Sequence, residues 1–175
     1  MKIKERRSLK KESKRERTIN RVLLSLIVFL LAVIVFSSIF YLRSNRPYAQ
    51  AEKEATALAK KYANLENVDQ FYWYTREKTY FSLMGTNDKN QKIVVVIPKS
   101  GDKVKILDQN KGLTEEEAKQ KIQEAHPEAV IEKATLGIFE DQPVWEVVAK
   151  GTDNSLSYYL ITFESGDEVK TIQNI

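Results

Sequence analysis

Cysteine is absent from this chain of 175 residues, and histidine occurs once, as His126. Without a thiol the chain can form no disulfide, carry no lipid on a cysteine and use no cysteine nucleophile. A single histidine falls short of the two or more that most zinc sites without cysteine use. It directly precedes Pro127, where a helix is expected to end, so it fits a helix cap better than a catalytic base.

Glycine is also scarce, with six residues, and none belongs to a glycine-rich phosphate loop or a G-x-S-x-G element. The acidic run 115–117 could suggest a cation site, but it lies in the first turn of an expected helix, where the helix dipole favours carboxylates. We therefore expect no enzyme activity, no metal site, no cofactor and no small-molecule substrate. A function carried out through protein contact is the remaining expectation.

What the chain does have is one long apolar run, residues 22–42, with 16 strongly apolar residues among 21 and no charge. As a helix it is about 32 Å long, enough to cross the hydrocarbon core of a bilayer. Its strongly apolar residues contribute on the order of −6 kcal/mol to insertion. The core helix of a soluble protein would carry a polar stripe, which this run does not have. We expect a single transmembrane helix here.

Charge is distributed unequally on the two sides of this run. Residues 1–21 carry ten Lys or Arg and three Glu, a net of +7, whereas residues 44–175 carry 17 Lys or Arg and 21 Asp or Glu, a net of −4. Short basic flanks stay in the cytoplasm, so we expect residues 1–21 to be a basic cytoplasmic tail and the C-terminal part to be extracytoplasmic at the cell membrane. The tail has no aromatic residue and no recognition fold, so nucleic acid is not an expected partner.

A cleaved signal peptide is the alternative interpretation of the apolar run. The apolar region of a signal peptide is normally about 7–15 residues long, shorter than this one. The triplet Ala49-Gln50-Ala51 matches a cleavage site, but it follows Pro47 and lies within an expected helix. The expected state is therefore an anchor that stays attached.

Beyond the run, the pattern predicts one helix followed by four strands. Pro47 suits the first turn of a helix, and apolar residues then recur at helical spacing over residues 48–64. Aromatic and β-branched runs separated by turn residues predict strands over residues 70–76, 78–85, 91–98 and 103–107. These elements form a first unit, residues 47–109.

The same order of elements returns in a second unit, residues 112–175. Thr114 and Glu117 have the spacing of a capping box, which predicts the start of a helix that ends before Pro127. Strands are predicted over residues 129–139, 143–150, 156–163 and 168–172.

An internal repeat relates the two units. With an offset of 65 residues, segment 80–105 aligns without a gap onto segment 145–170, which places Tyr80 opposite Trp145. We infer an α+β fold in which an N-terminal transmembrane helix precedes two tandem units, each with one helix packed on an antiparallel sheet.

Four consecutive aromatic residues occupy the first predicted strand: Phe71, Tyr72, Trp73 and Tyr74. Side chains alternate across a strand, so two of them face each side of the sheet. One side must face the helix, and the other is either covered by the second unit or exposed to a protein partner. If an outward pair exists, it is either Phe71 and Trp73 or Tyr72 and Tyr74, and we predict that this pair binds the partner.

With its short basic N-terminus, single span and two tandem units, the chain resembles the YpmB/TseB-like cell-wall elongation regulators of Firmicutes. The second unit is similar to a PepSY module, on the run Val144-Trp145-Glu146-Val147 followed by Tyr-Tyr-Leu-Ile at 158–161 and Ser165-Gly166-Asp167. The resemblance covers about residues 20–175 and implies that both units are cystatin-like.

This resemblance also implies a function. Members of the YpmB/TseB-like family are membrane-anchored, extracytoplasmic, non-enzymatic regulators of peptidoglycan elongation that act by protein contact on a penicillin-binding transpeptidase. No catalytic residue carries over from them. PepSY modules elsewhere accompany secreted proteases as inhibitory segments, so a membrane-tethered inhibitor of an extracellular protease is the alternative function.

The charge asymmetry generates a prediction on topology. Protease added to intact cells stripped of their wall should digest residues 44–175, because the basic flank keeps the N-terminus inside. Immunoblotting against each end of the chain measures this. Protection of the C-terminal part would reverse the topology, and a mature chain that begins at Glu52 would show removal of the anchor.

Overall fold

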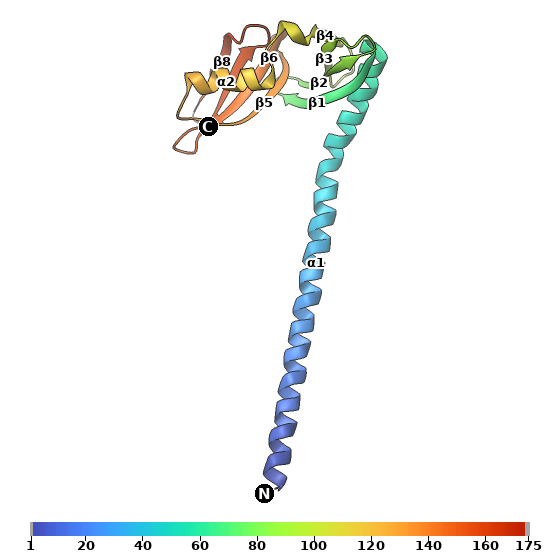
Figure 1. The fold of residues 1–175 in the computed structure, drawn as a ribbon, viewed down its shortest axis with the longest axis vertical. Coiled ribbons are helices and arrows are strands. Elements are labelled where there is room, and N and C mark those ends of the chain that lie inside the picture. The colour runs from blue at the N-terminus through green and yellow to red at the C-terminus, as the bar shows by residue number, and fades with distance from the viewer. Residues whose placement is uncertain (1, 174–175) are drawn as a thin grey trace. The chain divides into compact units, whose positions relative to one another are not determined.

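The structure is a computed structural model that describes residues 2–173; for residues 2–15, 42, 44 and 45 only the backbone is described. The chain divides into two compact units between Tyr48 and Ala49. One helix, α1 (Lys2–Ala63), contributes to both units, and all described strands follow it (Figure 1).

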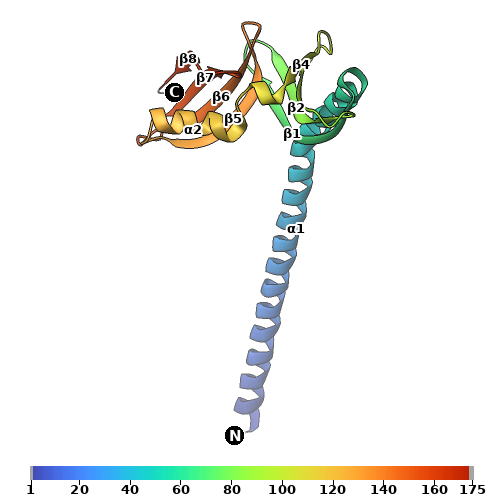
Figure 2. The same ribbon diagram turned by 45° about the horizontal axis from the view of Figure 1, so that its top comes forward.

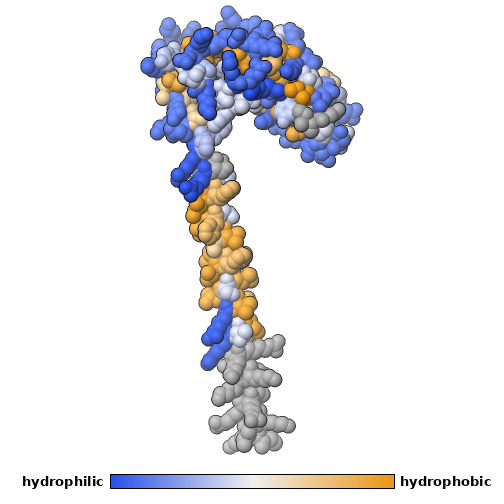
Figure 3. Space-filling model, turned by 180° about the vertical axis from the view of Figure 1, so that it is seen from behind, coloured by the Kyte–Doolittle hydropathy of each residue, from blue (hydrophilic) through white to orange (hydrophobic). Residues whose placement is uncertain are grey.

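Within the N-terminal unit, α1 is apolar over residues 22–42. Its large apolar side chains between Val22 and Phe40 are 45–77% exposed. They form a band along the helix (Figure 3). Among the described residues, α1 is the one helix that is long and apolar enough to cross a membrane. Its placement in a bilayer remains a prediction.

We predicted that Pro47 lies in the first turn of a new helix. This prediction was wrong, because Pro47 lies inside α1. An interior proline removes one backbone hydrogen bond and disfavours a helix by roughly 3 kcal/mol. The residues that follow it are mostly Ala, Glu, Lys and Leu, which are the strongest helix formers. The boundary between the two compact units nevertheless falls directly after Tyr48, next to this proline.

The C-terminal unit begins with the last turns of α1 and the first sheet. This sheet is antiparallel, with its strands in chain order: β1 (Leu65–Thr75), β2 (Thr79–Asn87), β3 (Lys92–Pro98) and β4 (Lys105–Asp108). Ala55 and Ala59 of α1 are buried against Leu83 and Val95 of the sheet. Alanine at these positions lets the helix approach the sheet closely, whereas Tyr62 on the same helix is 52% exposed.

A second sheet with its own helix follows a 3-10 turn, η1 (Gln109–Lys111). Helix α2 runs Glu115–Ala125, and the antiparallel strands are again in chain order: β5 (Val130–Phe139), β6 (Gln142–Lys150), β7 (Leu156–Thr162) and β8 (Glu168–Ile172). Figure 2 shows α2 lying across this sheet. The Thr114–Glu117 capping box is present, as predicted. The predicted α+β fold with two tandem helix-and-sheet units is confirmed.

The central hairpins of the two helix-and-sheet units, β2–β3 and β6–β7, are closely similar. The last strand pairs before the loops are Thr86–Lys92 and Lys150–Leu156, and each loop has one asparagine with positive φ, Asn90 at 56° and Asn154 at 67°. Every one of these positions differs from its counterpart by 64 residues. The hairpins of the repeat therefore correspond at an offset of 64, not at the predicted 65.

This one-residue difference changes the counterpart of Trp145. The paired residues Trp145 and Ile161 correspond to Phe81 and Ile97, so the predicted equivalence of Trp145 with Tyr80 was wrong. A slip of one residue exchanges the two faces of a strand. Tyr80 lies half-buried on the face of β2 that looks away from α1, whereas Phe81 packs on the α1 side.

The error has a local cause in the turn after each hairpin. The amide N–H of Gly101 donates to Pro98 three residues earlier, whereas that of Gly166 donates to Thr162 four residues earlier. The second unit thus holds one more residue in this turn. The matching Ser-Gly-Asp sequences at the end of this turn align at an offset of 65 residues. Applying the same offset to the strands before the turn shifted their alignment by one residue.

Trp145 generates a prediction on stability. Its side chain is fully buried, and its indole Nε1 donates to the carbonyl of Leu113 at 2.9 Å. Trp145→Ala should lower the free energy of unfolding by about 3–5 kcal/mol, because it leaves a large cavity and an unsatisfied acceptor. Denaturant melts of the full chain in non-ionic detergent, followed by near-UV circular dichroism, measure this.

Tyr80→Ala is the comparison variant for this measurement. Tyr80 is half-buried, so its loss should be clearly smaller than that of Trp145. A loss below about 1 kcal/mol for Trp145→Ala would contradict the assignment of this residue to the core.

Candidate functional site

Two of the four predicted aromatics, Tyr72 and Tyr74, lie between the sheets. They are 8% and 1% exposed. The ring of Tyr72 meets Trp145 edge-on, with centroids 5.3 Å apart, whereas Tyr74 is buried in a cluster with Val144 and Leu160. Trp145 and Val144 are neighbours on β6 and so point to opposite faces of the second sheet. The two tyrosines therefore lie on the two sides of β5, the edge strand next to β6.

Small residues allow β5 to lie this close to the first sheet. A Cβ atom on Gly137 of β5 would lie 2.1 Å from Cγ of Tyr74, so only glycine fits there. The buried hydroxyl of Ser82 on β2 donates to the carbonyl of Leu136 on β5 at 2.8 Å. This bond supplies a donor to the backbone of an edge strand that is shielded from water, where a missing partner would be costly.

Polar groups complete the contact at both ends. The hydroxyl of Tyr72 donates to Glu115 at 2.7 Å, and the same carboxylate pairs with Lys119 one turn along α2. Arg76, directly after β1, forms an ion pair with Glu146 of the second sheet. Burial raises the pKa of the Tyr74 hydroxyl above its ordinary value, with a further contribution from Glu146, so this hydroxyl stays neutral at all physiological pH values.

The other two predicted aromatics, Phe71 and Trp73, lie on the opposite face of β1, on the α1 side. Both are half-buried and pack against Phe81 of β2, with ring centroids 6.0 Å and 5.2 Å from it. We call these three residues, Phe71, Trp73 and Phe81, the aromatic ladder. Burial of Tyr72 and Tyr74 leaves Phe71 and Trp73 as the accessible pair, and their partner-binding role remains a prediction.

Sequence reasoning missed a second feature, a lysine-lined pocket of about 740 Å³. Its walls come from the start of β2, the turn between β3 and β4, and the β5–β6 turn. Four lysines line it: Lys78, Lys99, Lys103 and Lys105. The spacing of the last three was visible in the sequence, but only folding brings Lys78 and the second sheet beside them.

Family models match both helix-and-sheet units. The model "Cell wall elongation regulator TseB-like domain" matches residues 54–98, and "Peptidase propeptide and YPEB domain", the PepSY model, matches residues 112–172. The residues between the two matches, 99–111, include β4 of the first sheet and η1.

Known proteins are similar over most of the chain. One is "Probable cell wall elongation regulator TseB" of Bacillus subtilis (strain 168), 25% identical over 147 residues, which are 83% of this chain and 91% of that protein. The solved structure of the YpmB protein from Bacillus subtilis is 24% identical and aligns with a TM-score of 0.61 over 69% of this chain and 95% of that one. This second likeness supports the fold.

Two consecutive helix-and-sheet units joined face to edge define the class, a tandem α+β protein whose second half is a PepSY domain. A TseB-like match before a PepSY match, and a relative that is similar through both, support the YpmB/TseB-like family for this chain.

The close contact at Gly137 generates a prediction. Gly137→Ala should lower the free energy of unfolding by about 1–3 kcal/mol, because the new methyl group must displace the ring of Tyr74. Gly151→Ala is the matched control. Its new Cβ atom would lie closest to the side chain of Asp153 and far from the contact between the sheets, so it tests the effect of a Gly-to-Ala change by itself. In a double-mutant cycle with Tyr74→Ala, the two losses should add to more than the loss of the double variant. Strict additivity in denaturant melts would show that Gly137 and Tyr74 are independent.

Proposed function

We propose that this protein is a membrane-anchored, extracytoplasmic regulator of cell-wall elongation that acts by contact with a penicillin-binding transpeptidase and catalyses no reaction itself. The observation that carries this proposal is the similarity to a probable cell wall elongation regulator along 83% of the chain. The match of residues 54–98 to the TseB-like domain model also supports it.

The apolar helix supports the membrane part of the proposal. Residues 22–42 are uncharged, and their large apolar side chains that the structure describes are exposed. In a bilayer this surface is solvated by lipid, whereas in water a contiguous apolar surface of this size promotes aggregation. Anchoring also raises the effective concentration of the regulator near any membrane-anchored partner, so a weak contact suffices.

The aromatic ladder supports the contact part. Aromatic residues dominate protein–protein hot spots, and Phe71 and Trp73 present ring surface at half exposure. Tyr72 and Tyr74 cannot take this role without separating the two sheets, because they are buried against β5 and β6. We therefore assign the partner contact to Phe71 and Trp73.

Crosslinking in native membranes tests this assignment. The tagged full chain carrying Phe71→Thr and Trp73→Thr should capture about thirtyfold less transpeptidase than the unaltered chain, since losing a hot spot costs about 2 kcal/mol. Threonine keeps the strand propensity of these positions. Tyr62→Thr, which removes an exposed aromatic residue from α1, should leave capture unchanged and is the matched control.

A melting curve recorded for each variant separates binding from folding. Capture that survives in a folded double variant would place the contact elsewhere. If the double variant unfolds, Trp73→Thr alone is compared with Tyr62→Thr, and equal capture by both would also contradict the assignment.

The PepSY match favours a second candidate function, inhibition of an extracellular protease. The purified full chain in non-ionic detergent would then slow secreted proteases at substoichiometric to equimolar amounts. The regulator proposal predicts unchanged proteolysis rates, so this assay distinguishes the two functions.

A further inference from the structure

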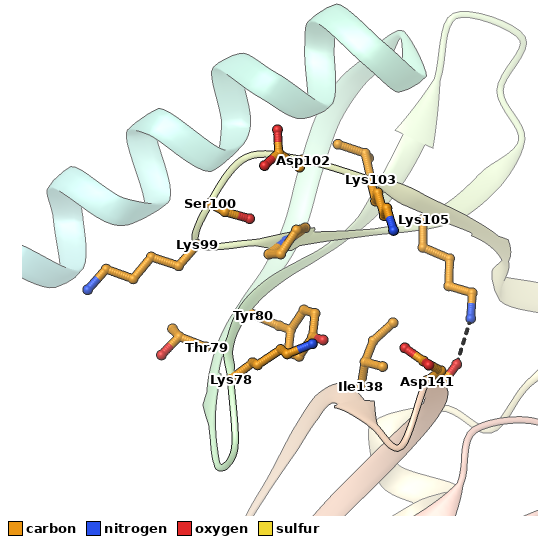
Figure 4. A pocket seen from close by; sticks show the side chains of 12 residues that line it. Lys78, Thr79, Tyr80, Lys99, Ser100, Asp102, Lys103, Lys105, Ile138 and Asp141 are labelled. Carbon is orange, nitrogen blue, oxygen red and sulfur yellow. Dashed lines mark hydrogen bonds between the residues drawn. The ribbon is translucent and has the colours of Figure 1, made fainter.

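The lysine-lined pocket lies between one end of the first sheet and the β5–β6 turn (Figure 4). Its apolar lining residues are Pro98, Val104 and Ile138, and residues with hydroxyl groups are Thr79, Tyr80 and Ser100. In Figure 4 the amino group of Lys99 points away from those of Lys78, Lys103 and Lys105. We call the last three the pocket lysines.

The charge of this pocket is opposite to that of the unit that contains it. Residues 49–175 carry 16 Lys or Arg and 21 Asp or Glu, a net of −5. The pocket lining carries four lysines against two carboxylates, those of Asp102 and Asp141. Such a local excess of one sign in a concave site raises the local concentration of ligands of the opposite sign.

Two pocket lysines are held in defined positions. The amino group of Lys105 donates to the backbone carbonyl of Asp141 at 3.0 Å, which ties β4 to the β5–β6 turn. Lys103 has a φ of 53°, a left-handed backbone conformation that is unfavourable for a residue with a side chain.

We propose that this pocket binds the phosphate groups of an anionic ligand. Four lysines line the pocket, and lysine binds phosphate groups as a point charge. The hydroxyl group of Tyr80 can donate to phosphate oxygens. The apolar lining residues can contact the carbon skeleton that carries the phosphates, which distinguishes such a ligand from inorganic phosphate.

Lysine footprinting of the full chain tests the proposal at single residues, which is necessary because the N-terminal tail is also basic. The full chain in non-ionic detergent is acetylated with and without tripolyphosphate. Mass spectrometry then gives the acetylation rate of each lysine, which falls where a bound anion covers its amino group. Tripolyphosphate should slow acetylation of the pocket lysines about fivefold or more, by charge pairing. It should change the exposed lysines Lys89, Lys92 and Lys133 by less than about twofold at the same concentration.

Variants of the pocket sharpen this test, with Lys78 as the reporter. Lys103→Ala with Lys105→Ala should abolish most of the protection of Lys78, whereas the charge-matched pair Lys89→Ala with Lys92→Ala should preserve it. Asp141→Asn should lower the half-protecting concentration about two- to fivefold, because it removes a facing negative charge. Asparagine tolerates the positive φ of Asp141, 63°, so the turn is retained.

A glutamate oligomer of matched charge decides the ligand class. Equal or stronger protection by this oligomer would overturn the phosphate proposal in favour of an acidic protein segment. Equal protection of all lysines by tripolyphosphate would overturn it as well.

The source of the phosphate is distinguished in nanodiscs. Protection of the pocket lysines by phosphatidylglycerol discs, but not by phosphatidylcholine discs, assigns the phosphate to lipid headgroups. Protection by soluble tripolyphosphate alone assigns it to a phosphorylated ligand outside the bilayer. Either result supports the phosphate site, and a failure of transpeptidase crosslinking would leave it untouched.

Discussion

The contact of β5 with the first sheet is the constraint on which the C-terminal unit depends. An edge strand exposes backbone groups that must be satisfied when they are removed from water. Here the hydroxyl of Ser82 donates to that backbone, and Gly137 leaves room for the ring of Tyr74. Tyr72 and Tyr74 cover the two sides of the strand. Each helix-and-sheet unit alone is of a size that is marginal for independent stability. Burial of the surface between them therefore accounts for their forming one compact unit.

The alternation of β1 follows directly from this constraint. Once Tyr72 and Tyr74 are committed to the second sheet, Phe71 and Trp73 must face the other way, beside the last turns of α1. There the alanines of α1 cover the centre of the sheet and leave the aromatic ladder only half covered. A run of four aromatics that looks redundant in the sequence is therefore divided between holding the fold and presenting a surface.

The sequence predicted every strand and the capped start of α2, because propensity, turn residues and capping are local. It did not predict the faces of the strands in the repeat. The alignment depended on the Ser-Gly-Asp turns, and the turn at Gly166 holds one residue more than that at Gly101. A strand has a period of two residues, so one residue was enough to confuse Tyr80 with Phe81 as the counterpart of Trp145. The continuation of α1 through Pro47 was missed for a similar reason, since the local rule for proline was outweighed by its neighbours.

The lysine-lined pocket escaped prediction because its charge is a property of three-dimensional proximity. Averaged over residues 49–175 the unit is acidic, and no segment of it reads as a basic run. Charges separated by more than about 8 Å are largely screened at physiological ionic strength, however, so the potential inside a pocket is set by the groups that line it. The β5–β6 turn brings Asp141 and its backbone carbonyl against Lys105, and the same turn closes the space beside Lys78 and Lys103. The contact that unites the two sheets thus also brings the lysines of this pocket together, within a unit that is acidic overall.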